Sequence, residues 1–313
     1  MKIVFMGTPD FAVTSLNKII ASGIEVAGVV TVPDRKSGRG QKVNSSPVKK
    51  AAESHGIPIL QPEKLKNPEF LKELNDLNAD LFVVVAFRML PKEVWQMPAL
   101  GTINLHGSLL PQYRGAAPIN WAIINGEKKT GVTTFFIDEK IDTGAIIDAE
   151  EIEIGSEDTA GVLHDNMMHV GADLLSKTIN KIFKGDVTTK SQKEINESSL
   201  RDAPKIFKED CAVDWNNEIE SIYNKIRGLS PYPAAYTTIV GTDGAEKKVK
   251  LFKVRITKDF NLNCTEIRID QKKIYFGASN GALEIMDLQI EGKKRMDAKS
   301  FLNGFSLGGY KLK

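Results

Sequence analysis

The chain has few of the residues that support redox chemistry or metal binding. Its 313 residues include two cysteines, Cys211 and Cys264, and four histidines. The cysteines are far apart in the sequence, and neither belongs to a CxxC or Cys/His pair with the spacing of a metal site. We therefore expect two reduced thiols, no disulfide framework and no bound metal, as is usual for a cytoplasmic protein.

Long apolar segments are also missing. The longest apolar run is LFVVVAF at Leu81–Phe87, far shorter than the roughly 20 residues needed to span a bilayer. The N-terminus, MKIVFMGTPDFA, lacks the long apolar region and the small-residue cleavage site of a signal peptide. These absences predict a cytoplasmic location and no membrane partner.

No strong charge of either sign is present. The net charge is +2 and 26% of the residues are charged, which are ordinary values for a globular protein. The charge is unevenly distributed, because residues 204–313 carry 19 Lys+Arg against 14 Asp+Glu, a net of +5. The remaining 23 Lys+Arg and 26 Asp+Glu give residues 1–203 a net of −3. The mildly basic second part permits nucleic-acid contact without requiring it.

Strand and helix patterns alternate through the first two hundred residues. Runs that predict strands occupy residues 2–7, 25–31, 59–62, 81–87 and 101–107, and two more flank the turn at residues 138–145. Helical patterns lie between them, and a long one covers residues 159–184. This alternation predicts a doubly wound α/β domain with a mostly parallel sheet. Ligands of such sheets bind beyond the carboxyl ends of the strands.

The pattern changes after a polar stretch near residues 184–199. Short β-prone runs separated by Gly and Asp turns dominate, among them KVKLFKVRI and ALEIMDLQI. They predict a small antiparallel barrel, and an oligonucleotide-binding-type (OB-like) barrel is one candidate. We therefore predict an α/β domain at residues 1–186, a linker at 187–204 and an OB-like domain at 205–313.

Three residues are candidates for catalytic chemistry: Asn104, His106 and Asp142. Asn104 and His106 are two apart in a predicted strand, so their side chains point to the same face near its carboxyl end. Taken alone, His106 is more often a core histidine bonded to a carbonyl, and Asp142 in the run IDTG is an ordinary turn residue. A loop aspartate can also reach a histidine, fix its tautomer and favour its imidazolium.

The loop after the histidine is GSLLPQYRGAAP, Gly107–Pro118. It combines flexible glycines with rigid prolines, and its apolar centre is unusual for an exposed loop. Such a loop could hold a flat amphipathic heterocycle, or it could simply plug a domain interface.

A second loop, Asp34–Lys42, is basic. Its cationic residues are Arg35, Lys36, Arg39 and Lys42, with two glycines between them. A solvated surface loop is the default interpretation, and phosphate capture is the functional one.

Two other patterns carry no chemistry. The run GTPD after the first strand is not the GxGxxG dinucleotide fingerprint. His164 and His169 are five apart on a predicted helix, a spacing that does not suit a metal site.

These motifs together resemble the formyltransferase family that uses 10-formyltetrahydrofolate. The likeness rests on the Asn–x–His pair, the run HGSLLPQYRGAAPI and the downstream IDTG. The runs PDRKSGRGQKVNSSPVK, RGLSPYPAAY and AKSFLNG extend it over essentially the whole chain, and resemble the family members that act on charged tRNA. One departure is AFRMLP, where Phe87 and Arg88 replace a Tyr-Gly pair that is common in the family.

The resemblance implies a fold, an activity and residue roles. Asn104, His106 and Asp142 match the catalytic trio, and the folate-binding loop corresponds to Ser108, Leu109, Leu110 and Pro111. Arg35, Lys36, Arg39 and Lys42 match a loop that meets the tRNA acceptor stem, and the OB-like domain is expected to bind tRNA. The implied donor is 10-formyltetrahydrofolate, the implied acceptor is initiator methionyl-tRNA, and no metal or obligate protein partner is implied.

Three other functions fit the same residues. The trio could formylate a small amine, such as a glycinamide nucleotide or an amino sugar, although the extra basic β-rich part argues against the former. The pocket could direct water instead, as in a formyl-folate hydrolase or dehydrogenase module. The chain could also be a non-catalytic RNA-binding protein, against which the intact trio argues.

Overall fold

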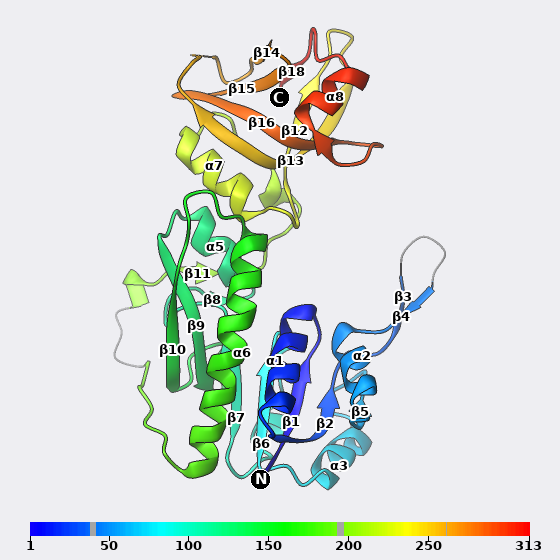
Figure 1. The fold of residues 1–313 in the computed structure, drawn as a ribbon, viewed down its shortest axis with the longest axis vertical. Coiled ribbons are helices and arrows are strands. Elements are labelled where there is room, and N and C mark those ends of the chain that lie inside the picture. The colour runs from blue at the N-terminus through cyan, green and yellow to red at the C-terminus, as the bar shows by residue number, and fades with distance from the viewer. Residues whose placement is uncertain (38–41, 193–196, 261) are drawn as a thin grey trace. The chain divides into compact units, whose positions relative to one another are not determined.

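The computed structural model describes residues 1–37, 42–192, 197–260 and 262–313 (Figure 1). These residues divide into two compact units. The first contains residues 1–115, 130–153 and 164–202, and the second contains residues 116–129, 154–163 and 203–313. The domain boundaries predicted from composition stay a prediction.

The first unit is built on a seven-stranded sheet with the order β10-β9-β7-β6-β1-β2-β5. Its strands are β1 (Lys2–Gly7), β2 (Glu25–Val30), β5 (Ile59–Leu60), β6 (Leu81–Val85), β7 (Thr102–His106), β9 (Lys129–Phe136) and β10 (Ile146–Glu153). The strands from β5 to β7 in this order are parallel, and β9 runs antiparallel to β7. The predicted doubly wound, mostly parallel sheet is confirmed.

Helices cover both faces of this sheet, as its apolar central strands require. They are α1 (Asp10–Ala21), α2 (Pro47–Ser54), α3 (Pro68–Asp76), α4 (Lys92–Trp95) and α6 (Ala160–Lys184), whose first turn belongs to the second unit. In β6 every residue is buried. Phe82 and Val84 of that strand pack in one cluster with Phe70 of α3 and Val94 of α4.

The two faces of β7 differ in chemistry. The Thr102 hydroxyl donates to the Trp95 carbonyl of α4 over 2.7 Å, so Thr102 points to the α4 face. Asn104 and His106 follow at two-residue intervals and point to this same face. Leu105 points to the other face, where a Cβ on Gly171 of α6 would lie 2.9 Å from it. The predicted common face of Asn104 and His106 is confirmed.

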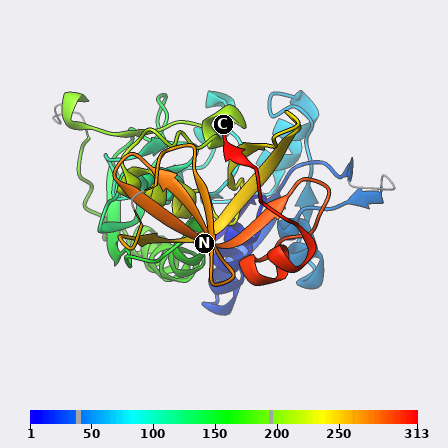
Figure 2. The ribbon, with the colours of Figure 1, turned by 90° about the horizontal axis from the view of Figure 1, so that it is seen from above.

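The second unit contains a seven-stranded antiparallel sheet. Its strands are β12 (Ala235–Val240), β13 (Glu246–Thr257), β14 (Ile267–Asp270), β15 (Lys273–Ala278), β16 (Gly281–Ile290), β17 (Met296–Asp297) and β18 (Lys311–Leu312). The order β14-β15-β16-β13-β12-β18 nearly closes on itself, because Leu312 of β18 donates its N–H to the Thr265 carbonyl just before β14, over 2.9 Å. Figure 2 shows these gold-to-red strands curving around one another. The predicted barrel-like domain is confirmed.

The remaining elements are short. They are α5 (Pro118–Ile124), α7 (Ile219–Gly228), α8 (Ala298–Gly304), the hairpin strands β3 (Arg35–Ser37) and β4 (Lys42–Asn44), β8 (Arg114–Gly115), β11 (Asp202–Ala203) and two 3₁₀ turns at Glu197–Ser199 and Glu209–Cys211. Within the described ranges, no helix has the length and apolarity to cross a membrane.

Candidate functional site

His106 ends β7 with its side chain buried in the first unit. It is 6% exposed, and its Nε2 lies 2.8 Å from the Tyr113 carbonyl oxygen. Because a carbonyl oxygen only accepts hydrogen bonds, Nε2 must carry the proton. The other nitrogen, Nδ1, lies 3.7 Å from Oδ2 of Asp142. The ring is therefore held by the backbone at one nitrogen and faces a carboxylate at the other, as a proton-transfer residue requires.

The backbone that holds this histidine has unusual geometry. Tyr113 is buried and has a φ of +60°, in the left-handed region that bulky residues rarely adopt. Its N–H donates to the Arg201 carbonyl over 2.6 Å, which helps to retain the conformation. Strained residues of this kind cost on the order of 1–3 kcal/mol and are often found at functional sites. Here the strained residue aims its carbonyl at His106.

Asp142 lies in the loop between β9 and β10. Its side chain is 13% exposed, and Oδ2 accepts the N–H of Gly115 over 2.9 Å. The same oxygen faces His106 Nδ1, so one carboxylate connects the histidine to the loop that follows it. The φ of Asp142 is +55°. A loop aspartate was expected to be able to reach the histidine, and in the structure Asp142 lies beside His106.

Asn104 is half-buried in the middle of β7. Its neighbours across the sheet are Val84 in β6 and Phe135 in β9. The strand therefore places Asn104 two residues before His106 and on the same face of the sheet. A side-chain amide here can donate to a developing negative charge beside the imidazole.

The loop Gly107–Tyr113 is packed tightly against β9. The buried Ser108 donates its hydroxyl to the Gln112 carbonyl over 2.6 Å, and its own carbonyl accepts from Thr133 over 2.7 Å. Leu110 is 8% exposed, and its N–H donates to the Thr133 hydroxyl over 3.1 Å. Leu109 and Pro111 are half-buried, so these two have side-chain surface left for a ligand.

Arg35, Lys36 and Lys42 lie on the hairpin of β3 and β4 (Figure 1). Arg35 is exposed and opposes Asn44, while Lys36 opposes Val43 and Lys42 opposes Ser37 in the hairpin register. Arg39 lies outside the described residues. The described basic residues thus belong to two paired strands.

Polar contacts fix the base of this hairpin. Asp34 accepts from Lys49 over 2.6 Å and from Gln61 over 2.9 Å. The hydrogen bond from Lys49 is the largest cause that lowers the pKa of Asp34 below its ordinary value. Gln61 also donates to the Val32 carbonyl over 2.8 Å. The chain entering the hairpin is therefore tied to α2 and to the segment after β5.

The segment that departs from the family pattern follows β6. Arg88 lies over the ring of Phe87 at 5.5 Å and donates to the carbonyls of Pro62 and Glu63. Burial, and then the nearby charge of Arg35, lower the pKa of this guanidinium below its ordinary value. Arg88 therefore joins the loop after β6 to the loop after β5.

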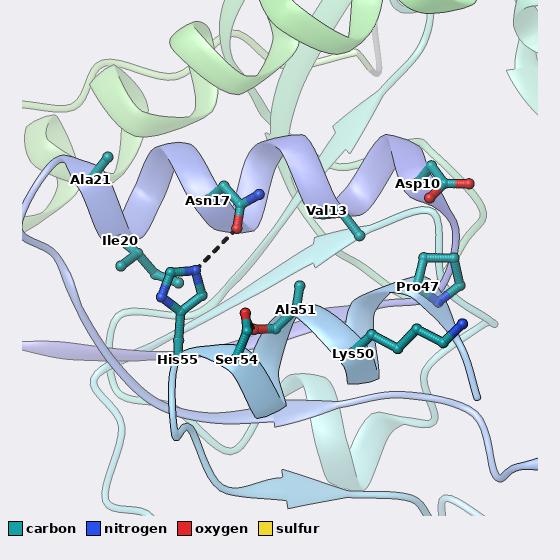
Figure 3. Close-up of a pocket in the computed structure, with 10 residues that line it drawn as sticks. All are labelled: Asp10, Val13, Asn17, Ile20, Ala21, Pro47, Lys50, Ala51, Ser54 and His55. Atoms are coloured by element: carbon teal, nitrogen blue, oxygen red, sulfur yellow. Dashed lines mark hydrogen bonds between the residues drawn. The ribbon is translucent and has the colours of Figure 1, made fainter.

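A surface groove of about 740 Å³ lies elsewhere, between α1 and α2 (Figure 3). Asp10, Asn17, Lys50 and His55 are among its lining residues, and none of the predicted site residues is. His55 follows the last residue of α2, and its Nε2 lies 3.3 Å from the Asn17 side-chain oxygen. In the part of the chain that the structure describes, no three His, Cys, Asp or Glu side chains gather as a possible metal site.

Two residues that support this site, Arg114 and Gln192, were not predicted from the sequence. Arg114 donates to the side-chain oxygen of Gln192, and the Gln192 amide donates to the carbonyls of Asp142 and Gly144. Gln192 lies in a stretch that its composition identified only as part of a linker, so no local pattern indicated these contacts.

Comparisons with known proteins show the family of this chain. The family model described as "Formyl transferase" matches residues 1–179, and "Formyl transferase, C-terminal domain" matches residues 205–306. A methionyl-tRNA formyltransferase of Azobacteroides pseudotrichonymphae is 52% identical over 310 residues, which cover 97% of this chain and 95% of that protein.

Solved structures share the fold at low identity. HypX from Aquifex aeolicus, in complex with tetrahydrofolic acid, has a TM-score of 0.66 at 18% identity; the match covers 99% of this chain and 48% of HypX, so this chain spans about half its length. An N-formyltransferase from Helicobacter canadensis, in complex with folinic acid and dTDP-3-aminofucose, has a TM-score of 0.62 at 22% identity over 91% of this chain and 98% of that one.

Proposed function

The chain belongs to the formyl transferase family, and we propose that it transfers the formyl group of 10-formyltetrahydrofolate to the amino group of initiator methionyl-tRNA. The acceptor is inferred from the 52% identity to a methionyl-tRNA formyltransferase, which extends through both units. The product would be formylmethionyl-tRNA, which begins translation. We place this activity in the cytoplasm, where charged tRNA is used.

The proposed reaction is direct attack without a covalent enzyme intermediate. The neutral amine attacks the formyl carbon, and the carbonyl electrons move to oxygen to give a tetrahedral oxyanion. Asn104 donates its amide N–H to this oxyanion. As the intermediate collapses, the folate nitrogen leaves with the bond electrons and takes a proton from His106, while the amine loses one.

In this proposal one nitrogen of His106 takes part in the proton transfer. Nε2 of His106 is occupied by the Tyr113 carbonyl, so Nδ1 is the atom that gains and loses the reacting proton. Asp142 lies 3.7 Å from Nδ1 and stabilises the imidazolium when it forms. Asp142 also takes part in removing the proton from the amine, through water.

We propose that the donor lies against the loop Ser108–Pro111. The hydroxyl of Ser108 is already bonded to the Gln112 carbonyl, so Ser108 shapes this loop from within. Leu110 is buried in the same way, and Leu109 and Pro111 offer the surface for the flat ring of the folate.

Two alanine variants distinguish donor binding from core packing in this loop. Leu110→Ala is expected to lower the free energy of unfolding by about 2–4 kcal/mol because it leaves a cavity, with little change in the KM of the donor. Leu109→Ala is expected to raise that KM about tenfold, as loss of roughly 1.4 kcal/mol of apolar contact would. Urea unfolding and steady-state kinetics measure both, and an unchanged donor KM in Leu109→Ala would favour the plug interpretation.

The acceptor is tested with the purified enzyme and a donor that carries a labelled formyl group. We expect label to appear on methionyl initiator tRNA, and neither on the uncharged tRNA nor on a glycinamide nucleotide or a nucleotide-linked amino sugar. Label on a small amine would replace the tRNA proposal. Labelled formate released without any acceptor would indicate a hydrolase, and binding of tRNA without transfer would indicate a non-catalytic protein.

A further inference from the structure

Gln192 is a buried polar residue in an otherwise exposed segment of the first unit. Its exposure is 5%, whereas its neighbours Lys190 and Ser191 are exposed. The segment follows α6 and is fixed by a backbone bridge, in which Lys190 and Ile146 exchange hydrogen bonds of 2.8 and 2.9 Å. The bridge sets Gln192 beside the loop that carries Asp142.

All the hydrogen-bonding capacity of this amide is used. Oε1 accepts from Nη2 and Nε of Arg114, over 2.8 and 3.3 Å. Nε2 donates to the Gly144 carbonyl over 2.7 Å and to the Asp142 carbonyl over 3.2 Å. A guanidinium only donates and carbonyls only accept, so the amide can face them in one orientation only.

The loop held by this amide is strained and closely packed. Asp142 has a φ of +55°, and a Cβ on Gly144 would lie 1.7 Å from the Phe136 carbonyl. A conformation of this kind persists only where its surroundings fix it. Gln192 holds the backbone of Asp142 through its hydrogen bond to the Asp142 carbonyl. It also holds the side chain of Arg114, which directly precedes Gly115. The N–H of Gly115 in turn donates to the Asp142 carboxylate.

We propose that Gln192 is a positioning residue that sets the Asp142 carboxylate against Nδ1 of His106. Through it, the segment after α6 is coupled to the chemistry of the site. This inference rests on the proposed function, because it assigns Asp142 a part in formyl transfer. Gln192 itself reaches no reacting atom in this role.

The first test is Gln192→Met, which keeps the length of the side chain and removes its hydrogen bonds. Single-turnover formyl transfer with saturating donor and methionyl-tRNA should be about 10- to 100-fold slower, since a displacement of about 1 Å at a reacting group can cost about 100-fold. The KM values of both substrates should change less than twofold. Lys190→Met is the matched control, because its exposed side chain is lost while its backbone bridge stays, and it should keep the parental rate.

A double-mutant cycle separates positioning from a general effect on structure. If Gln192 acts through Asp142, adding Gln192→Met to Asp142→Ala should slow the reaction less than twofold further. A second full 10- to 100-fold loss in that background would overturn the inference. All rates are measured below the unfolding range of every variant.

The Gln192→Glu variant tests the inference independently. It can be used even if the Gln192→Met variant does not fold. The carboxylate keeps the contact with Arg114 but places negative charge against the carbonyls of Asp142 and Gly144. We expect a loss as large as that of the Met variant, and a parental rate would overturn the inference. If the parent enzyme itself transferred no formyl group to methionyl-tRNA, the proposed function would fail instead, which the parental assay alone reveals.

Discussion

The His106→Ala and Asp142→Ala variants are expected to turn over several hundred-fold more slowly than the parent, and by as much as about 1,000-fold. One oxyanion or acid–base contact is typically worth about 100- to 1,000-fold in rate. In this site both residues are proposed to serve one proton transfer at Nδ1 of His106, which lies 3.7 Å from the Asp142 carboxylate. Because they act as a unit, the double variant should be little slower than the slower single one.

Folding should survive both substitutions. His106→Ala removes one hydrogen bond to the Tyr113 carbonyl, and Asp142→Ala removes one from the Gly115 N–H. Each such bond contributes about 1 kcal/mol to stability, against roughly 5–15 kcal/mol for a folded protein. Thermal denaturation should therefore show a cooperative transition in each variant.

Controls of the same residue types lie away from the site. His55→Ala changes the end of α2, and Asp186→Ala changes an exposed side chain after α6. Both should retain the parental rate within about twofold, as surface substitutions usually do. Near-parental turnover in either site variant, measured in single-turnover assays, would remove that residue from the mechanism.

The sequence predicted those parts of the site that depend on local periodicity. Asn104 and His106 are two residues apart in a strand, and the period of a strand places them on one face whatever the rest of the fold does. The burial of LFVVV in β6 follows equally from its composition. These predictions needed only neighbouring residues.

Contacts between distant segments could not be predicted in this way. Gln192 is 50 residues from Asp142 in the sequence, and its neighbours Lys190 and Ser191 are as polar as those of any linker. Its burial depends on the bridge between Lys190 and Ile146, for which no local pattern exists. The resemblance to a family identified the three candidate catalytic residues, but it did not indicate the contacts that Gln192 makes.

Burial of the loop after His106 was also hidden in the sequence. Its leucines look alike, yet Leu110 is buried with its N–H bonded to Thr133, while Leu109 is half-buried. The difference arises from the way the loop folds onto β9, which is a tertiary contact. Both leucines were predicted to bind folate, and the structure gives a reason to expect different effects from the two.

The second large effect is expected at the basic hairpin. We predict that the Arg39→Gln/Lys42→Gln double variant lowers kcat/KM for methionyl-tRNA about 100-fold while leaving donor binding unchanged. Two charge-assisted contacts to phosphate, at about 1.5 kcal/mol each, account for this loss. The ties of Asp34 to Lys49 and Gln61 fix the chain entering the hairpin, and Arg35 at its start is exposed. Lys42 lies in β4, so its position in the register is set before tRNA arrives.

Salt dependence shows whether the lost contacts are to phosphate. Each phosphate contact contributes roughly 0.7–0.9 to the slope of log affinity against log salt, so the double variant should have a slope smaller by about 1.4–1.8. The matched control is Lys64→Gln/Lys72→Gln, which removes one exposed lysine before α3 and one within it. This control should leave the slope unchanged. Formyl transfer at several salt concentrations gives both slopes. An unchanged slope in the Arg39/Lys42 variant would exclude the hairpin from the tRNA contact. If the acceptor were a small amine, the parent would show no such slope, because a small amine has no phosphate backbone for the hairpin to bind.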